Sequence, residues 1–226
     1  METQSGRDAA RALRHLPRAL KGWRPLAKGL GMLARLRRAG VPRYLGASNL
    51  AVLGDGQAEG LAFETGGQRR EIECETVLLH QGVVPNIQIT RALGCEHRWD
   101  EDQVCFHPVL DPWGRSSRPC VFVAGDGGGI YGAGAAELQG RIAALEIAHS
   151  LGVLSAADRD AAAAPLRRGL AREQAPRRML DALYPPPPAV RTPPTKPLSA
   201  VARKCTAGEI RQQVALGCRG RIRPRS

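Results

Sequence analysis

The first part of the chain alternates apolar and basic residues with the period of an amphipathic helix. Its apolar positions recur at three- and four-residue steps and are Leu13, Leu16, Leu20, Trp23, Leu26, Leu30, Leu33 and Leu36. This spacing predicts helix over residues 8–39. We expect two or three pieces, because Pro17 and Pro25 break the hydrogen-bond ladder, and we expect Gly40 to end the last piece.

Short apolar runs bounded by turn residues follow, and each predicts a β-strand. The predicted strands cover residues 43–45, 50–53, 60–64, 71–73 and 76–80. Glycine-containing turns at residues 54–56 and 66–67 separate some of these strands. The pattern predicts a small β-meander that leads into a strand over residues 78–86.

The last part of the chain has a helical composition before it becomes rich in proline. Helices are predicted through residues 142–151, 156–173 and 177–184. Pro185–Pro188 and Pro193–Pro194 then indicate a stiff linker. The tail after the linker is about 30 residues long, which is too short to bury much core unaided.

The stretch with the most chemical information is residues 120–148. Val121–Ala124 predicts a buried strand that ends in Gly125-Asp126, and a glycine-rich turn over residues 127–134 leads into a helix. Small residues on that helix permit close packing, namely Ala135, Ala136, Gly140, Ala143 and Ala144. A helix N-terminus offers free N–H groups, glycine lets the backbone approach a ligand, and a carboxylate accepts hydrogen bonds from hydroxyls. The segment predicts a site for a polar cofactor, and an ordinary strand-to-helix turn is the alternative.

The net charge of +12 raises the question of a nucleic-acid partner. Only four of the 33 basic residues are lysine, and the aromatic residues on which bases stack are sparse. We therefore expect no nucleic-acid partner. No apolar run is long enough to span a bilayer and no secretory signal opens the chain, so we expect a cytoplasmic location.

The six cysteines form no C-x-x-C pair and are Cys74, Cys95, Cys105, Cys120, Cys205 and Cys218. Their spacing favours free, buried thiols over a redox dithiol. His97 and His107 are interpreted as structural or solvent-facing residues, with residues 97–100 in a loop. No catalytic residue can be named.

Residues 123–148 resemble the second FAD-contacting motif of the pyridine nucleotide-disulfide oxidoreductase superfamily. The resemblance implies that the Asp126 carboxylate binds the ribityl chain of FAD and that the following helix N-terminus lies against the pyrimidine edge of the flavin. The expected cofactor-binding residues are Gly125, Asp126, Gly127, Gly134 and Ala135. Residues 78–86 resemble the strand and turn that close the NAD-like domain of the same family.

Longer segments, residues 13–42, 90–102 and 180–188, resemble the FAD subunits of heteromeric amine and amino-acid dehydrogenases, a group that includes hydrogen cyanide synthase and opine oxidase. The resemblance implies an α/β class: a partial FAD/NAD(P)-binding fold of two Rossmann-like dinucleotide-binding domains, with C-terminal helices and a remnant of a 2Fe–2S domain. It assigns residues 1–86 to the C-terminal part of the NAD(P)-like domain and residues 87–184 to the C-terminal part of the FAD domain with a helical extension. Residues 185–194 form the proline linker, and residues 195–226 form the degraded iron–sulfur remnant.

The function implied by the resemblance is that of an FAD-dependent oxidoreductase subunit. Such a protein takes part in oxidising the C–N bond of an amino acid, opine or related amine and passes the electrons through its flavin. The implied partners are an amino-acid-oxidase-like flavoprotein subunit, a small amine or amino-acid substrate and a membrane-associated electron acceptor. The location would then be cytoplasmic, peripheral to the inner membrane through the partner.

The sequence departs from this family in two places. It lacks the pyrophosphate-binding glycine turns that open the two dinucleotide-binding domains, and it lacks the four cysteines that hold a 2Fe–2S cluster. A shifted reading frame through residues 199–205 can encode the missing Cys-x-Cys pair. We therefore expect a truncated, frameshifted chain with no metal. The alternative is a non-catalytic flavoprotein remnant or a partner-binding scaffold.

Overall fold

The computed structural model describes residues 6–80, 82–186, 198–200 and 205–217. The chain divides into two compact units, Met1–Pro185 and Pro186–Ser226. The larger unit contains both helices and β-hairpins, so the mixed α/β class is confirmed. No helix in these described ranges is both long enough and apolar enough to cross a membrane.

The N-terminal region is helical in separate pieces, as its spacing predicts. These pieces are α1 (Gly6–Leu13), α2 (Leu16–Ala19), the 3-10 turn η1 (Leu20–Gly22) and α3 (Trp23–Arg38). Pro17 and Pro25 both lie in the first turn of a helix, where their missing N–H groups have no intrahelical partner to lose. Gly40 has a φ of +69°, which fits its predicted role in ending α3. Helix α1 packs against a later helix, α7 (Arg177–Leu183), whereas no residue of α3 is buried.

The predicted meander is present as a three-stranded antiparallel sheet in the order β1-β2-β3. Its strands are β1 (Ser48–Leu53), β2 (Gly60–Thr65) and β3 (Gln68–Glu73), and Leu61 of the central strand pairs with Val52 and Ile72. Phe63 is only 1% exposed and meets the Tyr44 ring edge-on, with 4.9 Å between ring centroids.

Three predicted strands of this region do not form. Residues 43–45 contain only a single bridge residue, Leu45, and the described residues of 76–80 and 78–86 belong to no strand. Most of their apolar side chains are exposed, Leu78 by 91%, although Tyr44 packs on Phe63 and Pro85 is buried. An apolar run becomes a strand only where a neighbouring strand accepts its hydrogen bonds, so the pattern alone was misleading here.

A short hairpin replaces the loop that the sequence predicts over residues 97–100. Helix α4 (Gln88–Ala92) leads into β4 (His97–Asp100), which pairs antiparallel with β5 (Cys105–Pro108). The Asp100 carboxylate closes the turn, because its Oδ1 accepts N–H groups from Asp102 at 3.1 Å and Gln103 at 2.9 Å. A local carboxylate-to-backbone contact of this kind gives no periodic signal, which explains why the hairpin was missed.

The Asp100 turn predicts a dependence of stability on pH. Burial opposes ionisation of Asp100, but the Gln103 N–H group and the nearby charges of His107 and Arg98 hold its pKa below the ordinary value of 3.8. A lowered carboxyl pKa contributes stability that is complete above the unfolded-state pKa and is lost as pH falls through the folded-state pKa. Asp100→Asn should therefore be less stable than wild type at pH 7, with the difference narrowing below pH 3.8.

Urea unfolding of the two proteins at a series of pH values measures this difference directly. A stability difference that stays constant from pH 7 down to about pH 2 would contradict the assigned role of the Asp100 carboxylate.

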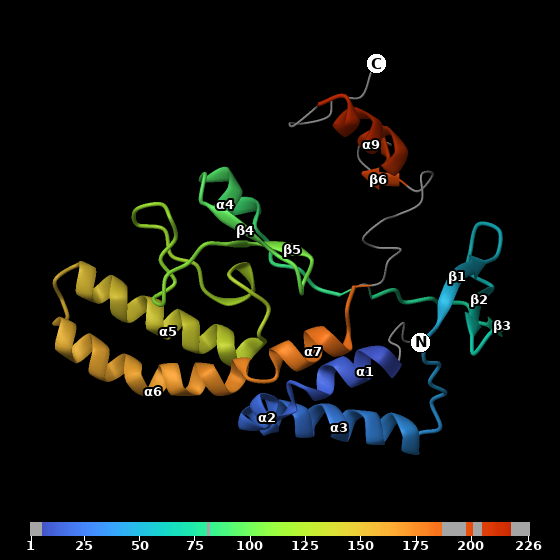
Figure 1. Cartoon of the computed structure of the whole chain (residues 1–226), viewed down its shortest axis with the longest axis horizontal. Helices are drawn as coiled ribbons and strands as arrows, with labels where there is room; N and C mark the ends of the chain where they lie inside the picture. Colours follow the sequence, from blue (N-terminus) through green and yellow to red (C-terminus); the bar gives the residue numbers. More distant parts are fainter. Residues whose placement is uncertain (1–5, 81, 187–197, 201–204, 218–226) are drawn as a thin grey trace. The chain divides into compact units, whose positions relative to one another are not determined.

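The three predicted C-terminal helices of the larger unit form at nearly the predicted positions. They are α5 (Ala133–Ser150), α6 (Ala156–Gln174) and α7. Figure 1 shows α5 and α6 side by side as an antiparallel hairpin. Ala135 and Ala163 are both 0% exposed, so small side chains permit the close helix packing that the sequence predicts. The Ser155 hydroxyl caps α6 by accepting the Asp158 N–H group.

The described part of the smaller unit contains a short hairpin and one helix. Strands β6 (Leu198–Ala200) and β7 (Cys205–Thr206) pair antiparallel and lead into α9 (Ala207–Ala215). Thr206 and Glu209 form a capping box at the start of α9. Most of the proline linker and Cys218 lie outside the described residues.

Candidate functional site

The segment that precedes the glycine-rich turn is extended, but it does not belong to a sheet. The predicted buried strand Val121–Ala124 is reduced to one isolated bridge, between Phe122 and Arg115. The Val123 N–H group donates to the Gly114 carbonyl at 2.8 Å. Within the described chain only residues 114–118 offer backbone pairing groups to this segment, so the strand prediction was wrong although the extended conformation is present.

The turn itself begins with a 3-10 turn, η2 (Gly125–Gly127), that packs on the first turns of α5. The Gly125 N–H group donates to Oε1 of Gln139 at 2.9 Å. Gly125 has a φ of +73°, and a Cβ added there would lie 3.3 Å from the Cβ of Ala136. Glycine is therefore required at this position by both backbone conformation and space.

Asp126 lies at the surface of this turn, with its carboxylate exposed. No described residue makes a hydrogen bond or ion pair with it. An exposed acceptor directly after an extended segment and beside a helix N-terminus fits the hydroxyl-binding role expected from the resemblance.

The helix N-terminus that follows is open. Gly132 occupies the N-cap position with a φ of +91° and has no side chain with which to cap α5. A Cβ added at Gly132 would meet nothing within 4 Å, so ligand atoms could reach the backbone there. Gly134 is exposed and Ala135 is buried, so Ala135 can contribute its backbone N–H group but not its side chain. These features fit the flavin-binding group that the resemblance implies.

Sequence reasoning missed one signal in this turn. Gly127, Gly129 and Gly132 have the G-x-G-x-x-G spacing, and Gly129 and Gly132 have φ values of +152° and +91°. The spacing is a weak motif alone, and the structure supplies only part of its usual context, because the turn opens a helix but follows a segment that belongs to no sheet.

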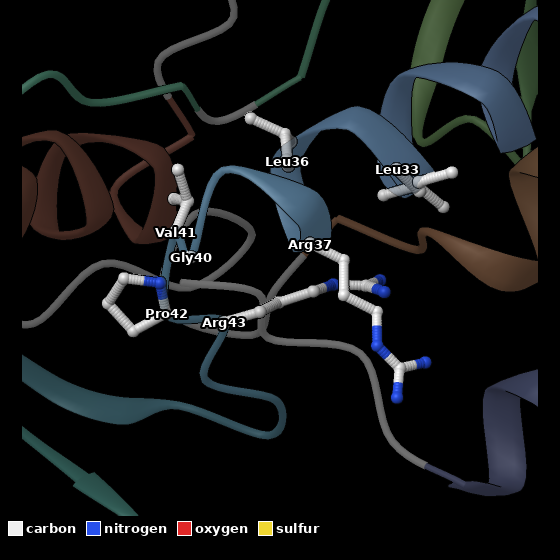
Figure 2. A pocket seen from close by; sticks show the side chains of 8 residues that line it. Leu33, Leu36, Arg37, Gly40, Val41, Pro42 and Arg43 are labelled. Carbon is white, nitrogen blue, oxygen red and sulfur yellow. The ribbon is translucent and has the colours of Figure 1, made fainter.

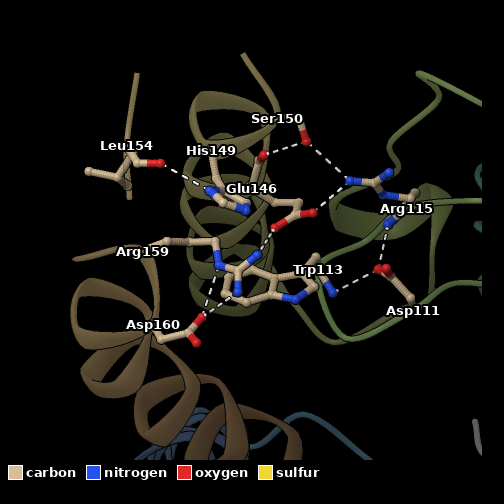
Figure 3. Close-up of polar contacts among 9 residues, drawn as sticks. All are labelled: Asp111, Trp113, Arg115, Glu146, His149, Ser150, Leu154, Arg159 and Asp160. Carbon is tan, nitrogen blue, oxygen red and sulfur yellow. Dashed lines mark hydrogen bonds and ion pairs between the residues drawn. The ribbon is translucent and has the colours of Figure 1, made fainter. Parts of the chain in front are cut away.

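A buried ion-pair cluster lies in the C-terminal part of α5, away from the helix start, and is also absent from the sequence predictions. Figure 3 shows the Glu146 carboxylate of α5 between two guanidinium groups, at 2.6 Å from Arg115 and 2.7 Å from Arg159. The Glu146 residue is only 7% exposed. Arg115 also donates to the Ser150 hydroxyl, and Arg159 stacks on the Trp113 ring. The cluster fastens residues 111–116 to the α5–α6 hairpin and thereby holds the extended segment that enters the turn.

The cysteines and histidines form no reactive centre among the described residues. Cys105 Sγ lies 3.4 Å from His107 Nε2, and both residues are buried. Burial, reinforced by the Asp100 carboxylate, raises the pKa of the Cys105 thiol, so the sulfur is protonated at neutral pH. Of the four cysteines whose side chains are described, Cys95 and Cys105 are buried as predicted, whereas Cys74 is half-buried and Cys120 is exposed. No group of His, Cys, Asp and Glu residues in the described ranges could hold a metal ion.

A cavity of about 740 Å³ lies away from the glycine turn, at the end of α3. Figure 2 shows its lining residues, which include Leu33, Leu36, Arg37 and Val41. This cavity includes no predicted site residue, and the candidate site is an open surface turn.

The sequence matches one protein-family model, that of the pyridine nucleotide-disulphide oxidoreductases, over residues 11–150. This match includes the whole glycine turn and all of α5. No solved structure matches the chain.

Curated relatives match long parts of the chain. The A subunit of opine oxidase from Rhizobium meliloti is 41% identical over 206 residues, which are 90% of this chain and 39% of the relative. The same protein from Agrobacterium tumefaciens is 38% identical over 214 residues, 91% of this chain and 41% of the relative. The hydrogen cyanide synthase subunit HcnB from Pseudomonas aeruginosa is 32% identical over 127 residues, 53% of this chain and 27% of the relative. The chain thus spans less than half the length of these relatives.

Proposed function

Because the chain belongs to the pyridine nucleotide-disulphide oxidoreductase family, we propose that residues 125–135 bind FAD in an oxidoreductase subunit. One observation supports this most strongly. The exposed Asp126 carboxylate lies on the turn that opens the uncapped N-terminus of α5. The Asp126 carboxylate is a hydrogen-bond acceptor, and the first N–H groups of α5 are donors. Together they suit a ligand that has both hydroxyl groups and an electron-rich ring edge.

Each residue of the turn has a distinct proposed role. Asp126 accepts hydrogen bonds from the ribityl hydroxyls, and Gly125 and Gly127 allow the backbone to approach the cofactor closely. The N–H groups of Gly134 and Ala135 are directed at the pyrimidine edge of the flavin. When bound, FAD supplies the hydride and electron chemistry, and this chain binds and orients it.

The relatives narrow the proposed reaction. The opine oxidase relatives and the hydrogen cyanide synthase relative are each named as one subunit of a larger enzyme. We therefore propose that this chain works beside an amino-acid-oxidase-like flavoprotein subunit. Their common substrate would be an amino acid, opine or related amine, oxidised at its C–N bond, with the electrons passing on to a membrane-associated acceptor.

A second function has one observation in its favour. The apolar residues Leu78, Leu79, Val83 and Val84 are all more than half exposed. An exposed apolar segment of this kind suits a partner-binding scaffold that has no catalytic role of its own.

Purification of the full chain with a visible absorption scan tests the proposed function. FAD bound in near-stoichiometric amount should give a band at about 450 nm that persists through gel filtration. A folded chain that remains colourless after incubation with excess FAD would exclude the flavin role and favour the scaffold.

A further inference from the structure

A second carboxylate lies at the N-terminus of α5, and it comes from a different helix. Glu173 is the penultimate residue of α6. A Cβ added at Gly134 would lie 3.2 Å from the carboxyl carbon of Glu173, and 3.3 and 3.6 Å from its two oxygens. The Glu173 carboxylate is therefore in contact range of the first turn of α5.

The packing of the hairpin fixes this position. Because α5 and α6 are antiparallel, residues one turn further along α5 meet residues one turn earlier in α6. The pair Gly134–Glu173 is accordingly followed by Leu138–Gly169, where an added Cβ at Gly169 would lie 3.2 Å from the Leu138 side chain. Ala135, which lies between Gly134 and Leu138 in the sequence of α5, is completely buried. Glu173 is held beside the helix N-terminus by this register and is not merely a long side chain that happens to reach it.

The charge of Glu173 has no opposite partner in the described part of the chain. None of the described ion pairs involves it, and Glu173 is half-buried. The first turn of α5 contains no acidic residue of its own and no side-chain cap. Glu173 thus adds a negative charge beside the partial positive charge of this N-terminus, next to the turn at which the proposed function binds FAD.

We propose that Glu173 tunes the flavin, and that its negative charge holds the reduction potential of the bound FAD low. This inference rests on the proposed function. Oxidation of the amine to an imine releases two electrons and two protons; FAD bound here would take up the two electrons and one proton and gain one negative charge, and the other proton would pass to solvent. A fixed carboxylate nearby opposes that charge, so it favours onward transfer of electrons over their retention.

The test compares Glu173→Gln with wild type in the full chain loaded with FAD. The midpoint potential, measured against a reference dye during dithionite reduction, should become more positive in Glu173→Gln. Sulfite, which adds to the oxidised ring and leaves it negatively charged, should bind the variant about tenfold more tightly, as expected for one charge at several ångströms in a partly wet site. Glu173→Asp keeps the negative charge, so its midpoint potential and its sulfite affinity should stay near those of wild type.

The matched control is Glu137→Gln, which removes the same charge from α5 at an exposed position paired with Arg141. It should leave both the potential and sulfite binding unchanged, because solvent screens that side chain. Glu173→Ala provides a second neutral variant, and circular dichroism establishes that each variant is folded.

The possible results separate the two proposals. If wild type binds no FAD, the proposed function fails and the role of Glu173 fails with it. If FAD binds and the neutral Glu173 variants keep the wild-type potential and sulfite affinity, the tuning role is overturned while the proposed function stands. If Glu137→Gln shifts the midpoint potential and the sulfite affinity as much as Glu173→Gln does, the tuning role of Glu173 is also overturned. The shift would then depend only on the net charge of the protein.

Discussion

Asp126→Ala should weaken FAD binding by about 10- to 100-fold, because hydrogen bonds to a charged acceptor contribute about 1.5–3 kcal/mol. Asp126 is exposed and makes no described contact within the chain, so its removal should leave the free energy of unfolding nearly unchanged. Loss of cofactor without loss of stability is the signature of a binding residue. Titration of the FAD-free chain with FAD, followed by flavin fluorescence, measures the dissociation constant.

Two further variants make the Asp126 result specific. Asp126→Asn keeps one oxygen acceptor and should retain an intermediate affinity. Asp55→Asn removes a carboxylate from an exposed turn between glycines, far along the sequence from the site, and should bind FAD like wild type. Wild-type affinity in Asp126→Ala would remove the residue from the proposed site.

Glu146→Ala should lower the free energy of unfolding by about 2–3 kcal/mol. The substitution deletes a buried carboxylate that pairs with Arg115 and Arg159 and leaves both guanidinium groups without it. We expect the loss of unfolding free energy to be smaller than the largest losses known for buried ion pairs. The reason is that the Arg115 side chain is 41% exposed, so water can partly replace the carboxylate. Urea unfolding, monitored by circular dichroism, measures the free energy of unfolding of Glu146→Ala and of wild type.

Glu137→Ala is the control for the ion-pair cluster, since its 3.9 Å contact with Arg141 is solvent-exposed on both sides. Its expected cost is below about 0.5 kcal/mol. If Glu146→Ala and Glu137→Ala lower the free energy of unfolding equally, the buried ion pairs of Glu146 stabilise the fold no more than an exposed pair does. Because the cluster holds residues 111–116 beside the segment that enters the turn, Glu146→Ala should also release FAD at lower urea concentrations than Glu137→Ala.

The parts of the fold that local sequence determines were predictable. The helices formed where apolar spacing predicts them and where Gly40 ends one of them, and the meander formed where glycine turns separate short strands. The strands over residues 76–80 and Val121–Ala124 were wrong for a shared reason: a strand depends on a partner elsewhere, and apolar composition does not reveal whether one is present.

The candidate site was predictable in its sequence but not in its surroundings. Asp126 and the glycines are contiguous, so a linear motif identifies them, and the turn does open a helix at Ala133. Packing of α6 on α5 brings Glu173 beside the first turn of α5, and the preceding loop brings Arg115 to Glu146 in the C-terminal part of α5. Contacts between residues so far apart in sequence have no periodic or short-range signal, and a single sequence therefore cannot show them.

The complete burial of Ala135 and Ala163 has a consequence for how this protein can vary through evolution. Small residues let the two helices of the hairpin approach each other, as where Gly169 lies against the Leu138 side chain, so a larger residue at such a position would strain this contact or displace one helix relative to the other. Such a displacement would move the amide groups at the start of α5 together with it. Substitutions should therefore be tolerated better on the outward faces of the hairpin than along its seam, where they would also move the backbone that is proposed to face the ligand.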